Sequence, residues 1–213
     1  MAASDPWPLI HAERAALAAD LEPLPESRWA TPSLCTGWSV RDVLAHMTAT
    51  AKLTPPAFFV RLAGSGFRFN AMVAREVVAE RGDSGADALG RFRAQLSATS
   101  HPPGPIDAMI GECVLHGEDI RRPLGIAHAY PAEVVARSAD FYKGSNLLLG
   151  TKRRIAGLTL RATDQEWSTG TGPDVTGPAV SLLLAMTGRP AGLVGLAGEG
   201  LPTLAGRLGA EPA

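Results

Sequence analysis

The chain is organised around the stretch Gly111-Glu112-Cys113-Val114-Leu115-His116-Gly117-Glu118-Asp119-Ile120. Glu112 and His116 are four residues apart, so in a helix both side chains project from one face, one turn apart. A carboxylate and an imidazole in this arrangement can hold one divalent metal ion. The same spacing also describes an ordinary solvated pair on a helix surface, so the stretch indicates a metal site only together with a third ligand.

The candidate for that third ligand is His46, within the run Trp38-Ser39-Val40-Arg41-Asp42-Val43-Leu44-Ala45-His46-Met47. Ser39 is typical of a helix N-cap, and Asp42 stands at the third helical position, as in a capping box. Trp38 and Val43 have the spacing of a hydrophobic staple. These signals predict a helix that begins at Ser39 and carries His46 on its apolar side. A histidine there is either a hydrogen-bonded core residue or a ligand on a rigid scaffold.

Composition limits the class of protein. A length of 213 residues suits one domain, or one domain with a small appendage. The apolar share of 46% permits a real core, and the formal net charge of −1 offers no basic surface for nucleic acid or for an anionic membrane. The longest uninterrupted apolar run, around residues 182–186, is far too short to span a bilayer.

Two features predict a cytoplasmic protein. Cys35 and Cys113 are the only cysteines, which is too few for a disulfide framework and typical of a reducing compartment. Residues 1–8 lack the basic region and apolar core of a secretion signal. The sequence is compatible with a monomer or a homodimer.

Up to residue 150 the apolar periodicity is helical, and no strand signal is present. Pro55 and Pro56 are expected to break the helix that begins at Ser39, leaving residues 58–62 as a short turn. Further helices are expected at residues 12–21, 70–81, 86–99, 106–122 and 131–149. These elements predict an all-α bundle over residues 1–150, and in such bundles metal sites are built from facing helices.

After Gly150 the pattern changes. Alternating and β-branched residues predict strands at residues 154–163 and 166–169, followed by Gly- and Pro-rich turns. Helices are expected at residues 179–187 and 201–208. The predicted fold class is therefore mainly α, with a small C-terminal α+β segment, residues 151–213, packed on the bundle.

The sequence resembles a known family in three places. These are Leu34-Cys35-Thr36-Gly37-Trp38-Ser39-Val40-Arg41-Asp42-Val43-Leu44-Ala45-His46, His116-Gly117-Glu118-Asp119-Ile120-Arg121-Arg122-Pro123-Leu124-Gly125, and residues 177–190. They are similar to motifs of DinB/YfiT-like metal-binding bundles, and most closely to the mycothiol-dependent maleylpyruvate isomerase family of actinobacteria.

The resemblance implies a DinB-like four-helix bundle with a divalent, zinc-type metal site of His46, Glu112 and His116. Three protein ligands leave a position open, as in catalytic sites. In the family the thiol that uses it is mycothiol, and a metal-bound thiol becomes a thiolate nucleophile at neutral pH. The implied function is a mycothiol-dependent isomerase or S-transferase that acts on a small electrophilic substrate.

The resemblance also suggests roles for two further residues. Arg189, in the C-terminal motif, is a candidate catalytic residue that binds an anionic group of the thiol or substrate. Its alternative is a surface arginine after a helix end. Asp119 either orients His116 as a hydrogen-bond acceptor or forms a salt bridge with a neighbouring arginine.

Other functions stay open at this stage. A non-catalytic, metal-containing protein that binds a small ligand would use the same bundle, and a hydrolase would use the open position for activated water. Turnover that depends on mycothiol separates these alternatives. The sequence contains no Ser-His-Asp arrangement, Walker loop or dinucleotide fingerprint that would support another class of enzyme.

Overall fold

The computed structural model describes residues 5–146 and 149–209. The chain is mainly helical, with one small three-stranded sheet near its C-terminus, which confirms the predicted fold class. Two compact units are present, residues 1–129 and 130–213. The division predicted from the sequence, at residue 150, lies about twenty residues beyond the division in the structure. The difference arises because the helix after the first unit, α7 (Ala132–Lys143), packs against two helices of the second unit, α8 (Thr151–Arg154) and α9 (Ala179–Met186).

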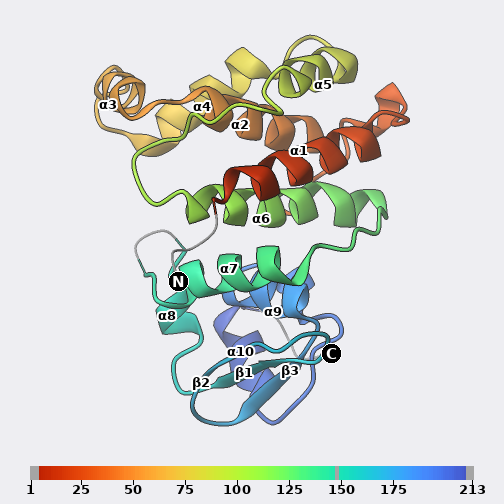
Figure 1. Ribbon diagram of the computed structural model, residues 1–213, viewed down its shortest axis with the longest axis vertical. Helices are drawn as coiled ribbons and strands as arrows, with labels where there is room; N and C mark the ends of the chain where they lie inside the picture. The colour runs from red at the N-terminus through yellow and green to blue at the C-terminus, as the bar shows by residue number, and fades with distance from the viewer. Residues whose placement is uncertain (1–4, 147–148, 210–213) are drawn as a thin grey trace. The chain divides into compact units, whose positions relative to one another are not determined.

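The first unit is a bundle in which α2 is the central helix (Figure 1). Its elements are α1 (Trp7–Leu21), η1 (Glu26–Arg28), α2 (Val40–Lys52), α3 (Pro55–Ala63), α4 (Phe69–Glu80), α5 (Gly85–Arg93) and α6 (Asp107–Leu124). Helix α2 packs against α4, α5 and α6, and α1 packs against α5 and α6. The two helices that carry the predicted metal ligands, α2 and α6, are therefore in direct contact.

The start of α2 is built as its sequence predicts. The Ser39 side chain accepts a hydrogen bond from the Asp42 backbone, and the Asp42 carboxylate accepts one from the Ser39 backbone at 3.0 Å. Both are amide groups that the first turn of a helix leaves without an intrahelical partner. The predicted turn after α2 is instead the helix α3, because Thr54 caps it and its prolines occupy the first helical positions, where no amide hydrogen is needed.

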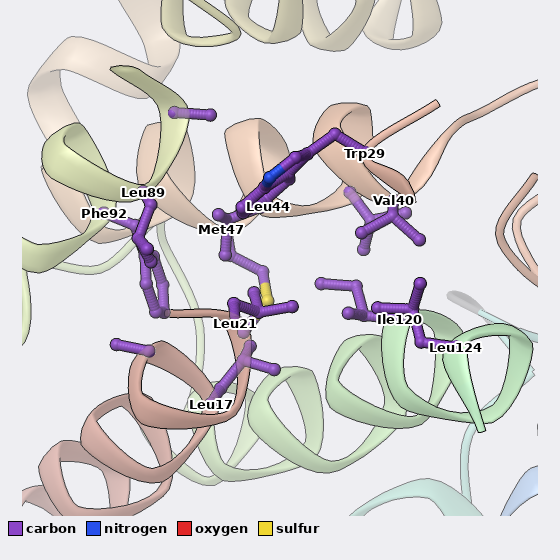
Figure 2. Close-up of a cluster of buried hydrophobic side chains, with 13 residues drawn as sticks. Leu17, Leu21, Trp29, Val40, Leu44, Met47, Leu89, Phe92, Ile120 and Leu124 are labelled. Carbon is purple, nitrogen blue, oxygen red and sulfur yellow. The ribbon is translucent and has the colours of Figure 1, made fainter. Parts of the chain in front are cut away.

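A cluster of buried apolar side chains joins α1, α2, α5 and α6 (Figure 2). Val43, Leu44 and Met47 of α2 belong to it and lie on both sides of His46 in the sequence. Ile120 contributes from α6, directly after Asp119. Burial of these side chains, each worth about 1.5–3 kcal/mol, holds the backbones of α2 and α6 in place beside the site.

A proline and a glycine mark the C-terminal end of helix α6. Pro123 lies in the last turn, and Gly125 forms the C-cap with φ of 71°. This left-handed conformation favours glycine, and it lets the amide of Gly125 satisfy carbonyl groups of the final turn.

The second unit combines short helices with the sheet. Its elements are α7, α8 (Thr151–Arg154), β1 (Thr159–Ala162), β2 (Ser168–Gly170), β3 (Asp174–Gly177), α9 (Ala179–Met186), η2 (Pro190–Leu193) and α10 (Leu201–Arg207). The strand order is β2-β1-β3, with β1 antiparallel to β2 and parallel to β3. The almost wholly buried helix α9 packs against α7, β1 and β3.

Two predictions for this unit differ from the structure. Strand β3 occupies a segment that the glycine and proline pattern assigned to turns, because it pairs with β1 through a non-local parallel ladder. Helix α7 ends at Lys143 rather than near residue 149, and residues 147–148 lie outside the described part of the chain. Within the described ranges, no helix has the length and apolar character needed to cross a membrane.

Candidate metal site

The three sequence-predicted ligands come from two neighbouring helices of the first unit. His46 lies in the middle of α2, and Glu112 and His116 lie one turn apart on α6. All three side chains are partly buried. The helical spacing predicted from the sequence is therefore present, and the packing of α2 on α6 brings the two histidines together.

The imidazole rings of His46 and His116 form a T-shaped contact, with ring centroids 5.0 Å apart and an interplanar angle of 87°. Two imidazoles that bind one ion through nitrogens at about 2.0–2.1 Å, at a tetrahedral angle, have centroids about 5 Å apart. The distance between the two ring centroids therefore matches that of two histidines on one divalent ion.

Burial controls the protonation of His46. Desolvation, reinforced by the nearby His116 and opposed by Asp119, lowers the pKa of His46 to about 3. The ring is consequently neutral at physiological pH, which is the form that ligates metals. The indole of Trp38 packs against the same ring, with centroids 5.3 Å apart, and restricts its orientation.

The surroundings of the Glu112 carboxyl group disfavour its ionised form. Desolvation raises the pKa of Glu112 to about 8, against the opposing effects of the Arg14 charge and of a hydrogen bond from Thr50. Thr50 lies one turn after His46 on α2, so Glu112 is directed toward the helix that carries the other ligand. A bound cation would offset the cost of ionising this carboxyl.

Asp119 orients the ring of His116 through a hydrogen bond. The buried Asp119 carboxylate lies 2.9 Å from His116 Nδ1, a hydrogen bond in which the ring nitrogen donates to Oδ2. Among the neighbouring arginines, Arg121 pairs with Asp20 and Arg122 pairs with Glu118. Donation from Nδ1 leaves Nε2 as the nitrogen that can ligate an ion, the arrangement common for metal-bound histidines.

Cys35 joins this pair and was not assigned to the site from the sequence. Its thiol donates to Asp119 Oδ2 at 3.1 Å and lies 3.8 Å from His116 Nδ1. Among residues 5–146 and 149–209, these three provide the only group of three potential ligand atoms that lie within 4.8 Å of one another. The signal that could have found Cys35 is its position eleven residues before His46 within one motif, but no spacing rule connects it to α6.

The predicted set of His46, Glu112 and His116 does not meet the same 4.8 Å limit in the described structure. Its donor types nevertheless fit zinc, since two imidazoles and one carboxylate are the protein ligands of known catalytic zinc sites. The fit rests on the ring separation, the neutral His46 and the orientation of His116.

Arg189 belongs to the second unit. It follows α9, is partly buried, and donates from Nη1 to the Thr187 hydroxyl at 3.4 Å. Burial lowers the pKa of Arg154, and the neighbouring charges of Arg153 and Arg189 lower it further. Arg189 thus stands in a cluster of cations, an environment that attracts an anion.

The remaining cysteine is a core residue. Cys113 is buried on α6, and desolvation raises the pKa of its thiol to about 12. Such a thiol stays protonated and unreactive at neutral pH. Of the two cysteines, the one that contacts the site is therefore Cys35.

Comparison with known proteins agrees with the fold and with the first of the three motifs, residues 34–46. Residues 10–103 match the sequence model of the mycothiol maleylpyruvate isomerase N-terminal domain. The matched residues include His46 and end before Glu112.

Two solved structures share the fold of this chain. One is the mycothiol-dependent maleylpyruvate isomerase, with a TM-score of 0.61, and the other is a variant of a mycothiol-dependent maleylpyruvate isomerase with a histidine replaced by alanine, with a TM-score of 0.62. Each is 15% identical to this chain, and the alignments cover 91% of both chains. A search of curated proteins finds no similar sequence.

Proposed function

We propose that this protein is a metal- and thiol-dependent enzyme, a mycothiol-dependent isomerase or S-transferase that acts on a small electrophile. The observation that carries the proposal is the pair of imidazoles from α2 and α6, with centroids 5.0 Å apart, next to a carboxyl group one turn away on α6. The similarity of residues 10–103 to the mycothiol maleylpyruvate isomerase N-terminal domain supports mycothiol as the thiol.

His46, Glu112 and His116 are the proposed metal ligands, and zinc is the proposed ion. When bound, a divalent ion lowers the pKa of a coordinated thiol and so provides a thiolate nucleophile at neutral pH. The residues around it have separate tasks. Asp119 keeps the proton of His116 on Nδ1, and Trp38 limits rotation of the His46 ring.

Arg189 is the proposed anion-binding residue. A substrate of the maleylpyruvate type carries carboxylates, and a guanidinium can receive a carboxylate with two hydrogen bonds. The cationic surroundings of Arg189, which include Arg153 and Arg154, favour such a group. Replacement by alanine should raise KM for an anionic electrophile much more than it changes the binding of zinc.

Isomerase and S-transferase reactions differ in what happens to the thiol. In isomerisation the thiolate adds to the cis double bond, rotation follows about the resulting single bond, and elimination of the same thiolate gives the trans product. The thiol is then regenerated in every cycle. In S-transfer the new carbon–sulfur bond remains, so one thiol is consumed for each product.

The test combines metal content with turnover. Protein purified without a histidine tag is loaded with zinc, mixed with mycothiol and maleylpyruvate, and followed by NMR together with free thiol. Isomer formation over many cycles at constant thiol supports the isomerase, and stoichiometric loss of thiol with adduct formation supports the transferase. His116→Ala should lose both zinc and turnover.

Three outcomes would reject the proposal. A wild-type protein that takes up no zinc would remove the metal site. Saturation at one equivalent of electrophile without product would favour a binding protein, and turnover that is independent of thiol would favour a hydrolase. The proposed partners are accordingly a low-molecular-weight thiol and a small electrophile, and the proposed compartment is the cytoplasm.

A further inference from the structure

The loop that precedes α2 contacts both candidate histidine ligands. Cys35 of this loop donates its thiol hydrogen to Asp119, which binds His116. Trp38 of the same loop packs on His46. One short segment therefore contacts His46 of α2 directly and His116 of α6 through Asp119.

The loop is itself fixed by a dense set of hydrogen bonds. The Ser33 hydroxyl donates to the Trp38 carbonyl at 2.8 Å and accepts from the Cys35 amide at 3.1 Å. The Trp38 amide donates back to the Cys35 carbonyl at 3.0 Å. Gly37 adopts φ of 80°, a left-handed conformation that favours glycine and allows the chain to turn. The Cys35 side chain consequently starts from a well-defined backbone.

A backbone contact also ties the loop to α6. The Leu34 amide donates to the Asp119 carbonyl at 3.1 Å, so Asp119 receives one hydrogen bond at its backbone from Leu34 and one at its side chain from Cys35. Asp119 is fully buried, and a buried carboxylate needs donors to remain stable. The Cys35 thiol supplies a donor to Oδ2, the same oxygen that accepts from His116.

We propose that Cys35 is a positioning residue, whose thiol orients Asp119 so that Asp119 in turn aims His116 Nε2 at the ion. This inference rests on the proposed metal site of His46, Glu112 and His116. In this arrangement the Cys35 thiol keeps its hydrogen and donates it to Asp119, and His116 Nδ1 also donates to Asp119, so neither atom ligates the ion. A single ring nitrogen cannot donate a hydrogen bond and bind a metal at the same time.

The test measures zinc affinity by competition with a chromophoric chelator, in wild type and in two Cys35 variants. Cys35→Ala removes the donor, and we expect zinc affinity to fall by about threefold to tenfold, below the 10–100-fold typical of losing the carboxylate itself. Cys35→Ser keeps an O–H donor, and its zinc affinity should lie within about twofold of wild type. Cys113→Ala is the matched control, since it removes the second cysteine of the chain, which lies on α6, and leaves the Cys35–Asp119 hydrogen bond in place.

Cobalt substitution adds a readout that a purely structural role would not change. Cobalt-loaded wild type should lack the intense near-ultraviolet band of thiolate ligation, and Cys35→Ala should alter the visible ligand-field bands while Cys35→Ser restores them. A thiolate band that disappears in both Cys35 variants would overturn the inference and make Cys35 a ligand. Equal zinc affinities and cobalt spectra in wild type and Cys35→Ala would also overturn it.

The outcomes distinguish this inference from the proposed function. Wild type that binds no zinc or cobalt contradicts the metal site itself, whereas zinc-binding wild type with an unaffected Cys35→Ala contradicts only the role of Cys35. Circular dichroism and thermal unfolding of each variant check that it is folded. If Cys35→Ala unfolds, Cys35→Ser still tests the role of Cys35. Retained zinc affinity in Cys35→Ser supports a role as hydrogen-bond donor, whereas reduced affinity indicates that the thiol is needed for packing.

Discussion

Glu112 should make the metal-free protein less stable as the pH rises above neutrality. Its pKa is raised from 4.5 to about 8 in the folded state, so folding takes up a proton between those values. Because the folded state then binds more protons than the unfolded state, the free energy of unfolding falls as the pH rises through this window. The effect is complete above the folded pKa, where both states are ionised.

His46 acts in the opposite direction and over a lower range. Its pKa is lowered from 6.5 to about 3, so its contribution to stability is present above pH 6.5 and is lost as the pH falls toward 3. Between about pH 4.5 and 6.5 the two residues oppose each other. Above pH 6.5 His46 is neutral in both states, and the effect of Glu112 can be measured alone.

The expected magnitude follows from the slope for one proton, about 1.4 kcal/mol per pH unit. Over the 1.5 units from pH 6.5 to 8, the free energy of unfolding of the wild type should fall by about 1–2 kcal/mol relative to Glu112→Gln. Urea unfolding in the presence of a chelator, at three pH values across this range, measures both slopes. Glu118→Gln provides the matched control, because Glu118 is also buried on α6 but is ion-paired with Arg122.

A parallel loss of stability in wild type and Glu112→Gln would show that Glu112 does not cause this pH dependence, and so would its removal by Glu118→Gln. Addition of zinc should cancel the loss above neutral pH if Glu112 ligates the ion, since the cation then stabilises the ionised carboxylate. Persistence of the full slope in zinc-loaded protein would place Glu112 outside the metal site.

Three further predictions test the site and the scaffold. Asp119→Ala should weaken zinc binding by about 10–100-fold, measured by chelator competition, because His116 loses its orienting acceptor. Ser39→Ala should lower the free energy of unfolding by about 1 kcal/mol in urea titrations, since it removes the N-cap of α2; an unchanged midpoint would contradict the capping role. Gly85→Ala should lower the thermal midpoint by an amount equivalent to about 1–3 kcal/mol, because the new methyl group would overlap the Trp29 ring, and stoichiometric zinc binding by the folded variant would show that the damage is confined to the scaffold.

Features of the site that depend on local sequence were predictable. The capping box at Ser39 and Asp42 fixes where α2 begins, and the structure confirms it. The spacing of Glu112 and His116 places both on one side of α6 whatever the rest of the chain does. Helix α3 has a signal of the same kind, a threonine followed by two prolines. Two prolines also predict the end of a preceding helix, and here they do both, ending α2 and occupying the first turn of α3.

Features that depend on non-local contacts were not predictable from periodicity. Strand β3 is defined by its parallel pairing with β1, and its own glycine- and proline-rich surroundings suggest turns. The boundary of the first unit depends on which helices α7 packs against, a property of tertiary contacts rather than of the α7 sequence. The hydrogen bond between Cys35 and Asp119 joins residues 84 positions apart, and nothing in either segment alone indicates it.

The site separates two requirements that a metal ligand has to meet. The backbone must be held at the correct distance, and the buried cluster of α1, α2, α5 and α6 does this by packing on either side of His46. The ring must also be held in one orientation, and this comes from polar and aromatic neighbours, namely Asp119 behind His116 and Trp38 against His46. The backbone position depends on apolar periodicity, which can be recognised in a sequence. The ring orientation depends on a loop that folds back onto another helix, which a sequence pattern does not indicate. Variants of the core should therefore reduce stability first, and variants of the loop should reduce metal affinity first.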